Sequence, residues 1–109
     1  LQGGDFVRGD GSGGEAAIGG ALKDEPAGLR ARHDAAGVVA MAHAGRPNSA
    51  ASGFYVTLAP APLLDGKHVA FGRVVNAAGL ALLGRLEALA AAEGGAPRVP
   101  VVIADCGQL

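Results

Sequence analysis

The sequence is poor in the residues that build covalent frameworks or large aromatic cores. Its 109 residues include no tryptophan, one tyrosine, three phenylalanines and one cysteine, Cys106. A single cysteine excludes an internal disulfide framework and a zinc site built on several cysteines, and this thiol is expected to be buried and inert. With 19 glycines and few aromatic rings, the core of this one small domain must consist of small aliphatic side chains.

An excess of charge of either sign is also missing. Nine lysines and arginines nearly balance ten acidic residues, so the formal net charge is −1 and the pI is about 6.3. This balance provides no basic surface for a phosphate backbone or an anionic membrane. No apolar run approaches the ~20 residues of a bilayer span. Neither nucleic acid nor a membrane is therefore expected as a partner.

Spacings typical of a metal centre or a hydrolase are absent as well. His33, His43 and His68 are far apart and no His-Glu-x-x-His pattern occurs, so no metal is expected. Asp65 and His68 could join Ser49, Ser52 or Cys106 in a hydrolytic set, but nothing places a nucleophile on a strained turn. The Gly-x-Gly-x-x-Gly match at residues 9–14 lacks the helix that a dinucleotide site needs.

Hydrophobic periodicity predicts a mainly β fold with one helix. Asn76 is a suitable N-cap, and the leucines that follow at helical spacing predict an amphipathic helix at residues 77–92. This helix should end near Gly94 and pack on the sheet rather than on a partner. No β-α-β unit repeats, which favours an antiparallel sheet or barrel. Strands are expected at residues 1–6, 37–42, 54–58, 69–75 and 99–106, with loops at 8–20 and 43–52.

The stretch from Leu64 to Val74 is the most informative part of the chain. Asp65-Gly66 is a strong turn signal, and the turn brings His68 to the start of a strand. Val69 and Phe71 alternate with smaller residues, so both are expected on the side of the strand that faces the core. This arrangement holds a polar histidine at the rim of an apolar surface.

Six motifs follow one another along the chain in a characteristic order. They are Gln2-Gly3-Gly4-Asp5-Phe6, Gly11-Ser12-Gly13-Gly14, Met41-Ala42, Ser52-x-Phe54-Tyr55, Leu64-Asp65-Gly66-Lys67-His68-Val69-x-Phe71-Gly72 and Asp105-Cys106-Gly107-Gln108-Leu109. Together they resemble the motifs of the cyclophilins, and the resemblance covers essentially all of residues 1–109.

This resemblance implies a mainly β fold, a cyclophilin-like antiparallel β-barrel of eight strands capped by two helices. It also implies peptidyl-prolyl cis/trans isomerase activity on X-Pro bonds in peptides and folding proteins, without a cofactor. The chain matches the later part of such a domain. The family's first strands and helix, its catalytic arginine and a phenylalanine of the proline pocket would precede Leu1. The chain is therefore expected to be a partial domain that is weak or inactive alone. A cytoplasmic location is also expected.

The resemblance further implies a cup for the proline ring. Tyr55 and Leu64 would form its floor and wall, and His68 would lie at its edge. Gln2 would hydrogen-bond substrate carbonyl groups, and Met41-Ala42 would approach the flanking peptide. No catalytic residue is assigned within the chain. The substrate-binding positions are Gln2, Met41, Ala42, His43, Tyr55, Leu63, Leu64 and His68.

Four positions depart from the family's usual pattern. His43 stands where asparagine is usual, at a position credited with backbone contacts, and Gly53 replaces a glutamine and removes a polar contact. Leu63 replaces a tryptophan, which removes an indole N–H donor and predicts weak cyclosporin binding at most. Tyr55 replaces phenylalanine and adds a hydroxyl that needs a partner if it is buried. A non-catalytic module that binds proline peptides is the alternative function, and a barrel retained for assembly is a third.

Overall fold

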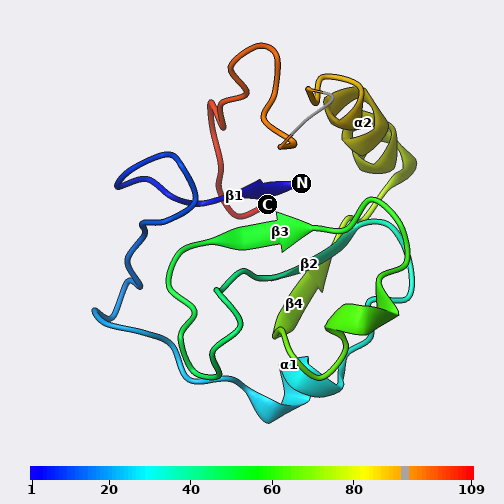
Figure 1. Cartoon of the computed structure of the whole chain (residues 1–109). Helices are drawn as coiled ribbons and strands as arrows, with labels where there is room; N and C mark the ends of the chain where they lie inside the picture. Colours follow the sequence, from blue (N-terminus) through cyan, green and yellow to red (C-terminus); the bar gives the residue numbers. More distant parts are fainter. Residues whose placement is uncertain (92–93) are drawn as a thin grey trace.

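The computed structural model describes residues 1–91 and 94–109, and its centre is a four-stranded antiparallel sheet (Figure 1). The order across the sheet is β1-β3-β2-β4, so β1 and β4 are its edges and the expected barrel is not closed. None of the described helices is long and apolar enough to cross a membrane. The elements are β1 (Gln2–Gly3), α1 (Pro26–Arg30), β2 (Val38–Met41), β3 (Phe54–Val56), the 3₁₀ helix η1 (Pro62–Leu64), β4 (Ala70–Arg73) and α2 (Ala77–Glu87).

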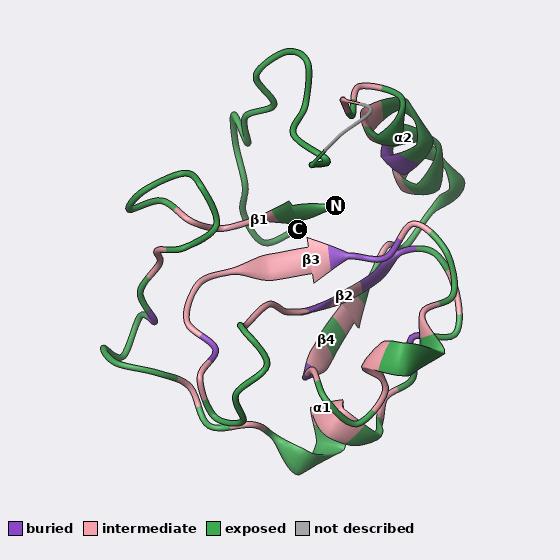
Figure 2. Cartoon of the chain, in the orientation of Figure 1, coloured by how far each residue is buried: buried purple, intermediate pink, exposed green. Residues whose placement is uncertain are grey.

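The centre of the sheet follows the predicted strands closely. In β2, Val38 and Ala40 are buried while Val39 and Met41 are half-buried, which is the alternation that a pleated strand imposes. Strands β2, β3 and β4 all fall inside their predicted ranges. Figure 2 shows the buried residues gathered along β2 and at the end of β3. The apolar core is built from small aliphatic side chains, as predicted: Ala16, Val38, Ala40, Ala50, Val56, Val69 and Leu83.

Strand β4 departs from the expected alternation at Phe71. Val39 of β2 pairs with Gly72, but Ala40 pairs with Ala70, so Phe71 is an extra residue in the ladder. Such a β-bulge changes the face to which the following side chains point. Val69 is buried as expected, whereas Phe71 is 60% exposed. The prediction that Phe71 anchors the strand to the core is therefore wrong.

Helix α2 begins where predicted and ends early. The Asn76 side chain accepts a hydrogen bond from the Gly79 backbone N–H at 2.8 Å, which confirms the N-cap. The helix ends at Glu87, and just beyond it the Arg98 guanidinium donates to the carbonyl of Ala88 at 2.6 Å. The expected end at residue 92 lies outside the described residues.

The position of α2 also differs from the prediction. Instead of packing on the sheet, it stands apart from the strands (Figure 1). Leu83 is buried, but Leu80 and Leu82 are exposed. Leu80 approaches Gly37, a glycine at φ +86° just before β2. Helical spacing therefore identified the helix correctly but not the surface that covers it.

The last predicted strand is absent. Residues 99–106 form no strand and every residue in this segment is exposed. An extended segment becomes a strand only by pairing with a neighbour, and this one pairs with none of β1 to β4. Cys106 is consequently exposed rather than buried. The expectation of a buried thiol fails for the same reason as the strand.

Two short helices were not predicted. Helix α1 starts at Pro26, a residue preorganised for a first helical turn, and Gly28 lets it approach β4 closely. Helix η1 starts at Pro62 and leads into the Asp65-Gly66 turn. Gly66 has φ +73°, the left-handed conformation that the turn signal predicted.

The glycine-rich loop that follows β1 is ordered around one carboxylate. Asp5 accepts backbone hydrogen bonds at 2.9 Å from Arg8, Gly11 and Gly13. These N–H groups, that of Arg8 foremost, hold the pKa of Asp5 well below its usual range. No helix starts at Gly14. The prediction that residues 8–20 form a loop is therefore confirmed.

Candidate functional site

Four rings form a continuous row through one end of the sheet. The ring of Tyr55 in β3 lies beside that of His33, with ring centroids 5.8 Å apart and planes 21° from parallel. On its other side Tyr55 meets His68 at 5.4 Å and 82°. His68 stacks in turn on His43 at 4.1 Å and 17°. The row therefore runs from a fully buried histidine to one at the surface of the site.

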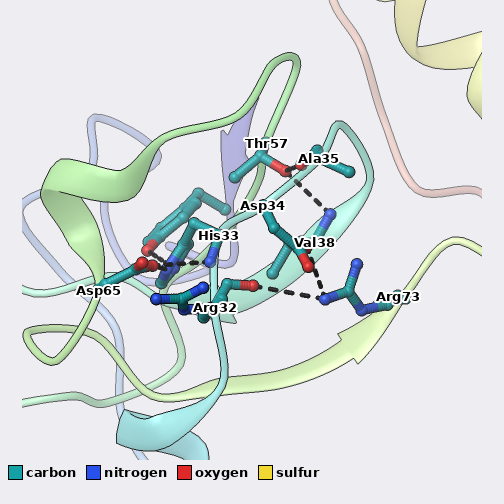
Figure 3. A network of polar contacts seen from close by, with 9 residues as sticks. Arg32, His33, Asp34, Ala35, Val38, Thr57, Asp65 and Arg73 are labelled. Atoms are coloured by element: carbon teal, nitrogen blue, oxygen red, sulfur yellow. Dashed lines mark hydrogen bonds and ion pairs between the residues drawn. The ribbon is translucent and has the colours of Figure 1, made fainter.

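His33 is the fixed end of this row. Its side chain has no exposed surface, and its Nδ1 lies 2.9 Å from Oδ1 of Asp65. The same carboxylate oxygen accepts the His33 backbone N–H at 2.7 Å, and the His33 carbonyl accepts the N–H of Ala61 at 2.8 Å. Figure 3 shows His33 and Asp65 in this network. Nε2 of His33 lies 2.7 Å from the Tyr55 hydroxyl. Every polar group of His33 therefore has a hydrogen-bond partner.

The direction of these hydrogen bonds follows from the charge of Asp65. The His33 backbone N–H, and then its ring, hold the pKa of Asp65 below its usual range. An ionised carboxylate only accepts hydrogen bonds, so Nδ1 carries the proton that it donates to Asp65. In the neutral ring Nε2 is then an acceptor, and the Tyr55 hydroxyl donates to it.

Tyr55 keeps its proton for this bond. Burial, and to a lesser extent the negative charge of Asp65, raises the pKa of Tyr55 to about 12. The hydroxyl that distinguishes Tyr55 from phenylalanine thus has a partner, as the sequence required of a buried one. Sequence reasoning did not identify His33 as that partner. The only signal was the added hydroxyl itself.

The turn after η1 brings His68 to the other side of Tyr55. His68 Nδ1 lies 3.0 Å from the carbonyl oxygen of Met41 and donates to it. Burial lowers the pKa of His68, and the neighbouring His43 lowers it further. A neutral imidazole is therefore favoured near pH 7.

His43 is locked in one orientation beside His68. Its Nε2 donates to the Lys67 carbonyl at 2.9 Å, and its Nδ1 accepts the backbone N–H of Gly45 at 3.0 Å. Both ring nitrogens are therefore hydrogen-bonded, one to the loop at residues 43–52 and the other to the turn before β4. His43 thus carries a side-chain role in the structure, stacking on His68, in addition to its backbone.

The remaining predicted positions lie around this row in different ways. Gln2 of β1 is paired with Tyr55, so the two side chains share one face of the sheet. Met41 is paired with Phe54 on the opposite face. The Met41 side chain there lines a separate cavity of about 630 Å³. The carbonyl oxygen of Met41 contacts the row of rings by accepting from His68.

Ala42 and the two leucines complete the set. The Ala42 N–H donates to the Gly53 carbonyl at 2.9 Å, which ties the end of β2 to the segment before β3. In η1, Leu64 is half-buried and Leu63 is 83% exposed. Leu63 therefore projects into solvent beside the site.

Two other site types can be assessed from the same geometry. Asp65 is hydrogen-bonded to His33 and not to His68, so the carboxylate needed for a hydrolytic set with His68 is engaged elsewhere. Across residues 1–91 and 94–109, no group of three or more histidine, cysteine, aspartate or glutamate side chains could hold a metal ion.

Comparisons with known proteins identify similar sequences over the full chain. The sequence model of the family described as cyclophilin type peptidyl-prolyl cis-trans isomerase/CLD matches residues 1–108. "Peptidyl-prolyl cis-trans isomerase D" of Mycosarcoma maydis is 43% identical over 109 residues, which cover 100% of this chain and 26% of that protein. "Peptidyl-prolyl cis-trans isomerase H" of Rhizopus delemar is 42% identical over 110 residues, which cover 100% of this chain and 59% of that protein. The chain thus spans less than two thirds of the length of either curated relative.

Proposed function

The chain belongs to the cyclophilin-type peptidyl-prolyl cis-trans isomerases, and from this premise we propose that it binds X-Pro segments, with the proline ring against Tyr55, in the service of their isomerisation. The observation that carries the proposal is the fixed ring of Tyr55. Its hydroxyl is held by His33 at 2.7 Å and its plane stands at 82° to the ring of His68. A rigid aromatic surface with a polar rim suits a proline ring followed by peptide backbone.

Prolyl isomerisation requires little of its catalyst beyond binding and polarisation. Rotation about an X-Pro bond faces a barrier of about 18 to 20 kcal/mol because amide resonance is lost, and uncatalysed exchange takes tens of seconds or longer. No bond is made or cleaved. An apolar surface for the ring, contacts that hold the flanking peptide and a donor that favours the twisted amide are sufficient.

Each role has a candidate in the chain. Tyr55 and Leu64 would contact the ring, and His68 would border it. Gln2 shares the face of Tyr55, which supports a role in holding substrate carbonyl groups. The further positions Met41, Ala42, His43 and Leu63 would contact the flanking peptide, with Leu63 in place of an indole donor weakening any binding of cyclosporin.

Turnover by residues 1–109 alone is proposed to be low. A strong hydrogen-bond donor to the twisted amide would accelerate rotation. The arginine side chains whose hydrogen bonds are described bind groups outside the row of rings. Arg8 reaches Ser12 and Arg98 reaches the Ala88 carbonyl, while Arg73 binds Asp34, as Figure 3 also shows. None of these contacts involves Tyr55 or His68. The alternative of a peptide-binding module without catalysis is favoured by the absent side chain at Gly53.

An NMR titration of the chain with an Ala-Pro peptide tests the proposal, combined with a protease-coupled isomerase assay. We expect shifts confined to residues near Tyr55, and exchange close to the uncatalysed rate. Gln2→Ala and His68→Ala should each weaken peptide binding without unfolding the chain. An unaltered spectrum at saturating peptide would reject the proposed site, and rapid turnover would reject the low-activity proposal.

A further inference from the structure

Tyr55 is anchored at its hydroxyl, which lies 2.7 Å from Nε2 of His33. A phenylalanine at this position would be held by packing alone. Tyr55 is only half-buried, yet its oxygen ends on a histidine with no exposed surface. The link joins residues that are 22 positions apart in the sequence. The half-buried ring is therefore connected to the most deeply buried polar group of the described chain.

The histidine itself cannot easily move. Its backbone N–H and its Nδ1–H both end on Oδ1 of Asp65, at 2.7 and 2.9 Å. Its carbonyl is bonded to the N–H of Ala61. These three contacts fix the imidazole before Tyr55 is considered, and they leave Nε2 as the acceptor that faces the hydroxyl. A preorganised acceptor restricts the tyrosine at little further entropic cost.

We propose that His33 is a positioning residue for the proline-binding face: bonded to Asp65 on one side, it holds the Tyr55 hydroxyl and so fixes the ring against which proline packs. The inference rests on the proposed function. It goes beyond it in assigning a role to His33 and Asp65, neither of which contacts the peptide. The interaction with His68 at 82° then depends on the same link, because that edge-to-face geometry requires one orientation of Tyr55.

Two substitutions of His33 distinguish its hydrogen bond to Asp65 from its hydrogen bond to Tyr55. Asparagine can place an amide N–H near the position of Nδ1, so His33→Asn retains a donor to Asp65 and loses the acceptor for Tyr55. Glutamine can place its amide oxygen near Nε2, so His33→Gln retains the acceptor. Tyr55→Phe removes the hydroxyl and leaves the ring. These variants form a double-mutant cycle with a conservative rescue.

The experiment measures the Kd of the full chain for an Ala-Pro peptide in each variant, with melting temperatures recorded in parallel. We expect His33→Asn and Tyr55→Phe each to raise the Kd about fivefold, as for loss of one neutral hydrogen bond. The double variant should be no weaker than either single variant, and His33→Gln should bind within about twofold of the unaltered chain. Additive effects, or equal losses in His33→Asn and His33→Gln, would overturn the positioning role.

A second readout separates this inference from the function on which it rests. The ¹⁵N resonance of His33 Nε2 reports the hydrogen bond from Tyr55 without any peptide, and Tyr55→Phe should shift it. No shift would overturn the link itself. A shift together with no peptide binding in the unaltered chain would instead reject the proposed function, and with it the role of the link in binding.

Discussion

At the scale of single residues, one oxygen changes how position 55 is held. The hydroxyl of Tyr55 would be costly to bury unpaired, and the chain satisfies it with the acceptor nitrogen of His33. That nitrogen is an acceptor only because Asp65 takes the proton on the other side of the ring. Across the described residues, no buried side-chain nitrogen or oxygen lacks a hydrogen-bond partner. A loss at one member of the network therefore affects the others.

The lowered pKa of Asp65 predicts a loss of stability in acid. In the folded chain the pKa of Asp65 lies below its unfolded value of about 3.9. At a pH between these two pKa values, unfolding is accompanied by the uptake of a proton. The contribution of Asp65 is complete above about pH 4 and is lost as the pH falls through the folded pKa. Melting temperatures should therefore fall less steeply with acid in Asp65→Asn, which keeps the acceptor oxygen but cannot titrate.

Asp34 provides the control for this experiment. It too has a lowered pKa, caused chiefly by its hydrogen bond with Arg73, but both partners are more than half exposed. Exposed ion pairs contribute little to stability. Asp34→Asn should leave the pH dependence of melting nearly unchanged. An acid profile that is the same in Asp65→Asn as in the unaltered chain would contradict the prediction.

Asp5 should control the order of the glycine-rich loop. One of its oxygens accepts from Arg8, and the other accepts from Gly11 and Gly13. Asp5→Asn turns one of these oxygens into an NH₂ group that faces N–H donors. We expect amide hydrogen exchange in the loop to become about tenfold faster on that side, while β2 and β3 keep their protection.

Asp10→Asn is the matched control in the same loop. The Asp10 carboxylate accepts only local hydrogen bonds from Ser12, at 2.9 Å from its backbone N–H and 2.6 Å from its hydroxyl. Its loss should therefore affect Ser12 alone. Unchanged exchange of Gly11, Gly13 and Arg8 in Asp5→Asn would show that the loop does not depend on this carboxylate.

At the scale of elements, the features encoded by neighbouring residues were predictable and the others were not. The Asp65-Gly66 turn and the Asn76 cap follow from local chemistry, and both are present. The bulge at Phe71 depends on its register with β2, and the carbonyl of Ala88, just past α2, is capped by Arg98 ten positions further along the chain. Periodicity within a segment carries no information about such partners.

The candidate site also contains residues that the sequence predicted and a contact that it did not. The cup positions around Tyr55 were assigned from the motifs that resemble the cyclophilins, and their roles in binding stay predictions. The link to His33 was not predictable, since His33 has no motif of its own and lies 22 residues from Tyr55. Only the need of the added hydroxyl for a partner was evident. Identifying that partner required the fold to bring the segment before β2 against β3.

Two glycines in helices predict opposite effects of the same substitution. A Cβ on Gly28 of α1 would lie 2.5 Å from a methyl carbon of Val69 and 2.9 Å from the Ala70 carbonyl oxygen, whereas one on Gly84 of α2 would meet nothing within 4 Å. Gly84→Ala should stabilise α2 by about 0.5 to 1 kcal/mol. Gly28→Ala should destabilise the chain by about 1 to 3 kcal/mol through overpacking.

Denaturant unfolding followed by circular dichroism measures both substitutions. The helical signal should rise in Gly84→Ala, and the unfolding midpoint should fall in Gly28→Ala. Equal stabilisation in both variants would mean that α1 can withdraw from β4 without cost. A loss of stability in Gly84→Ala would mean that α2 is packed against a surface that its exposed position does not indicate.

At the scale of the whole molecule, the sheet ends in two unpaired edges. Strands β1 and β4 each have one neighbour, and apolar side chains are exposed beside them and in the last segment of the chain. Exposed edge strands with apolar residues promote pairing between molecules. The described chain carries neither a lysine nor a proline in β4, which reads Ala-Phe-Gly-Arg. Arg73 and the bulge at Phe71 protect this edge only in part, because Phe71 itself stays exposed.

Self-association of the chain through β4 is the expected consequence. Phe71 is 60% exposed on this strand, and burying a phenylalanine is worth ~1.5–3 kcal/mol. Phe71→Lys should therefore weaken association at least about tenfold in sedimentation equilibrium, since 1.4 kcal/mol corresponds to one factor of ten. Phe6→Lys is the control, because Phe6 is 72% exposed but lies in a turn outside the strands. If the two variants weaken association equally, general hydrophobicity rather than the open edge drives it. If the unaltered chain stays monomeric at high concentration, the bulge at Phe71 is itself sufficient to block pairing at this edge.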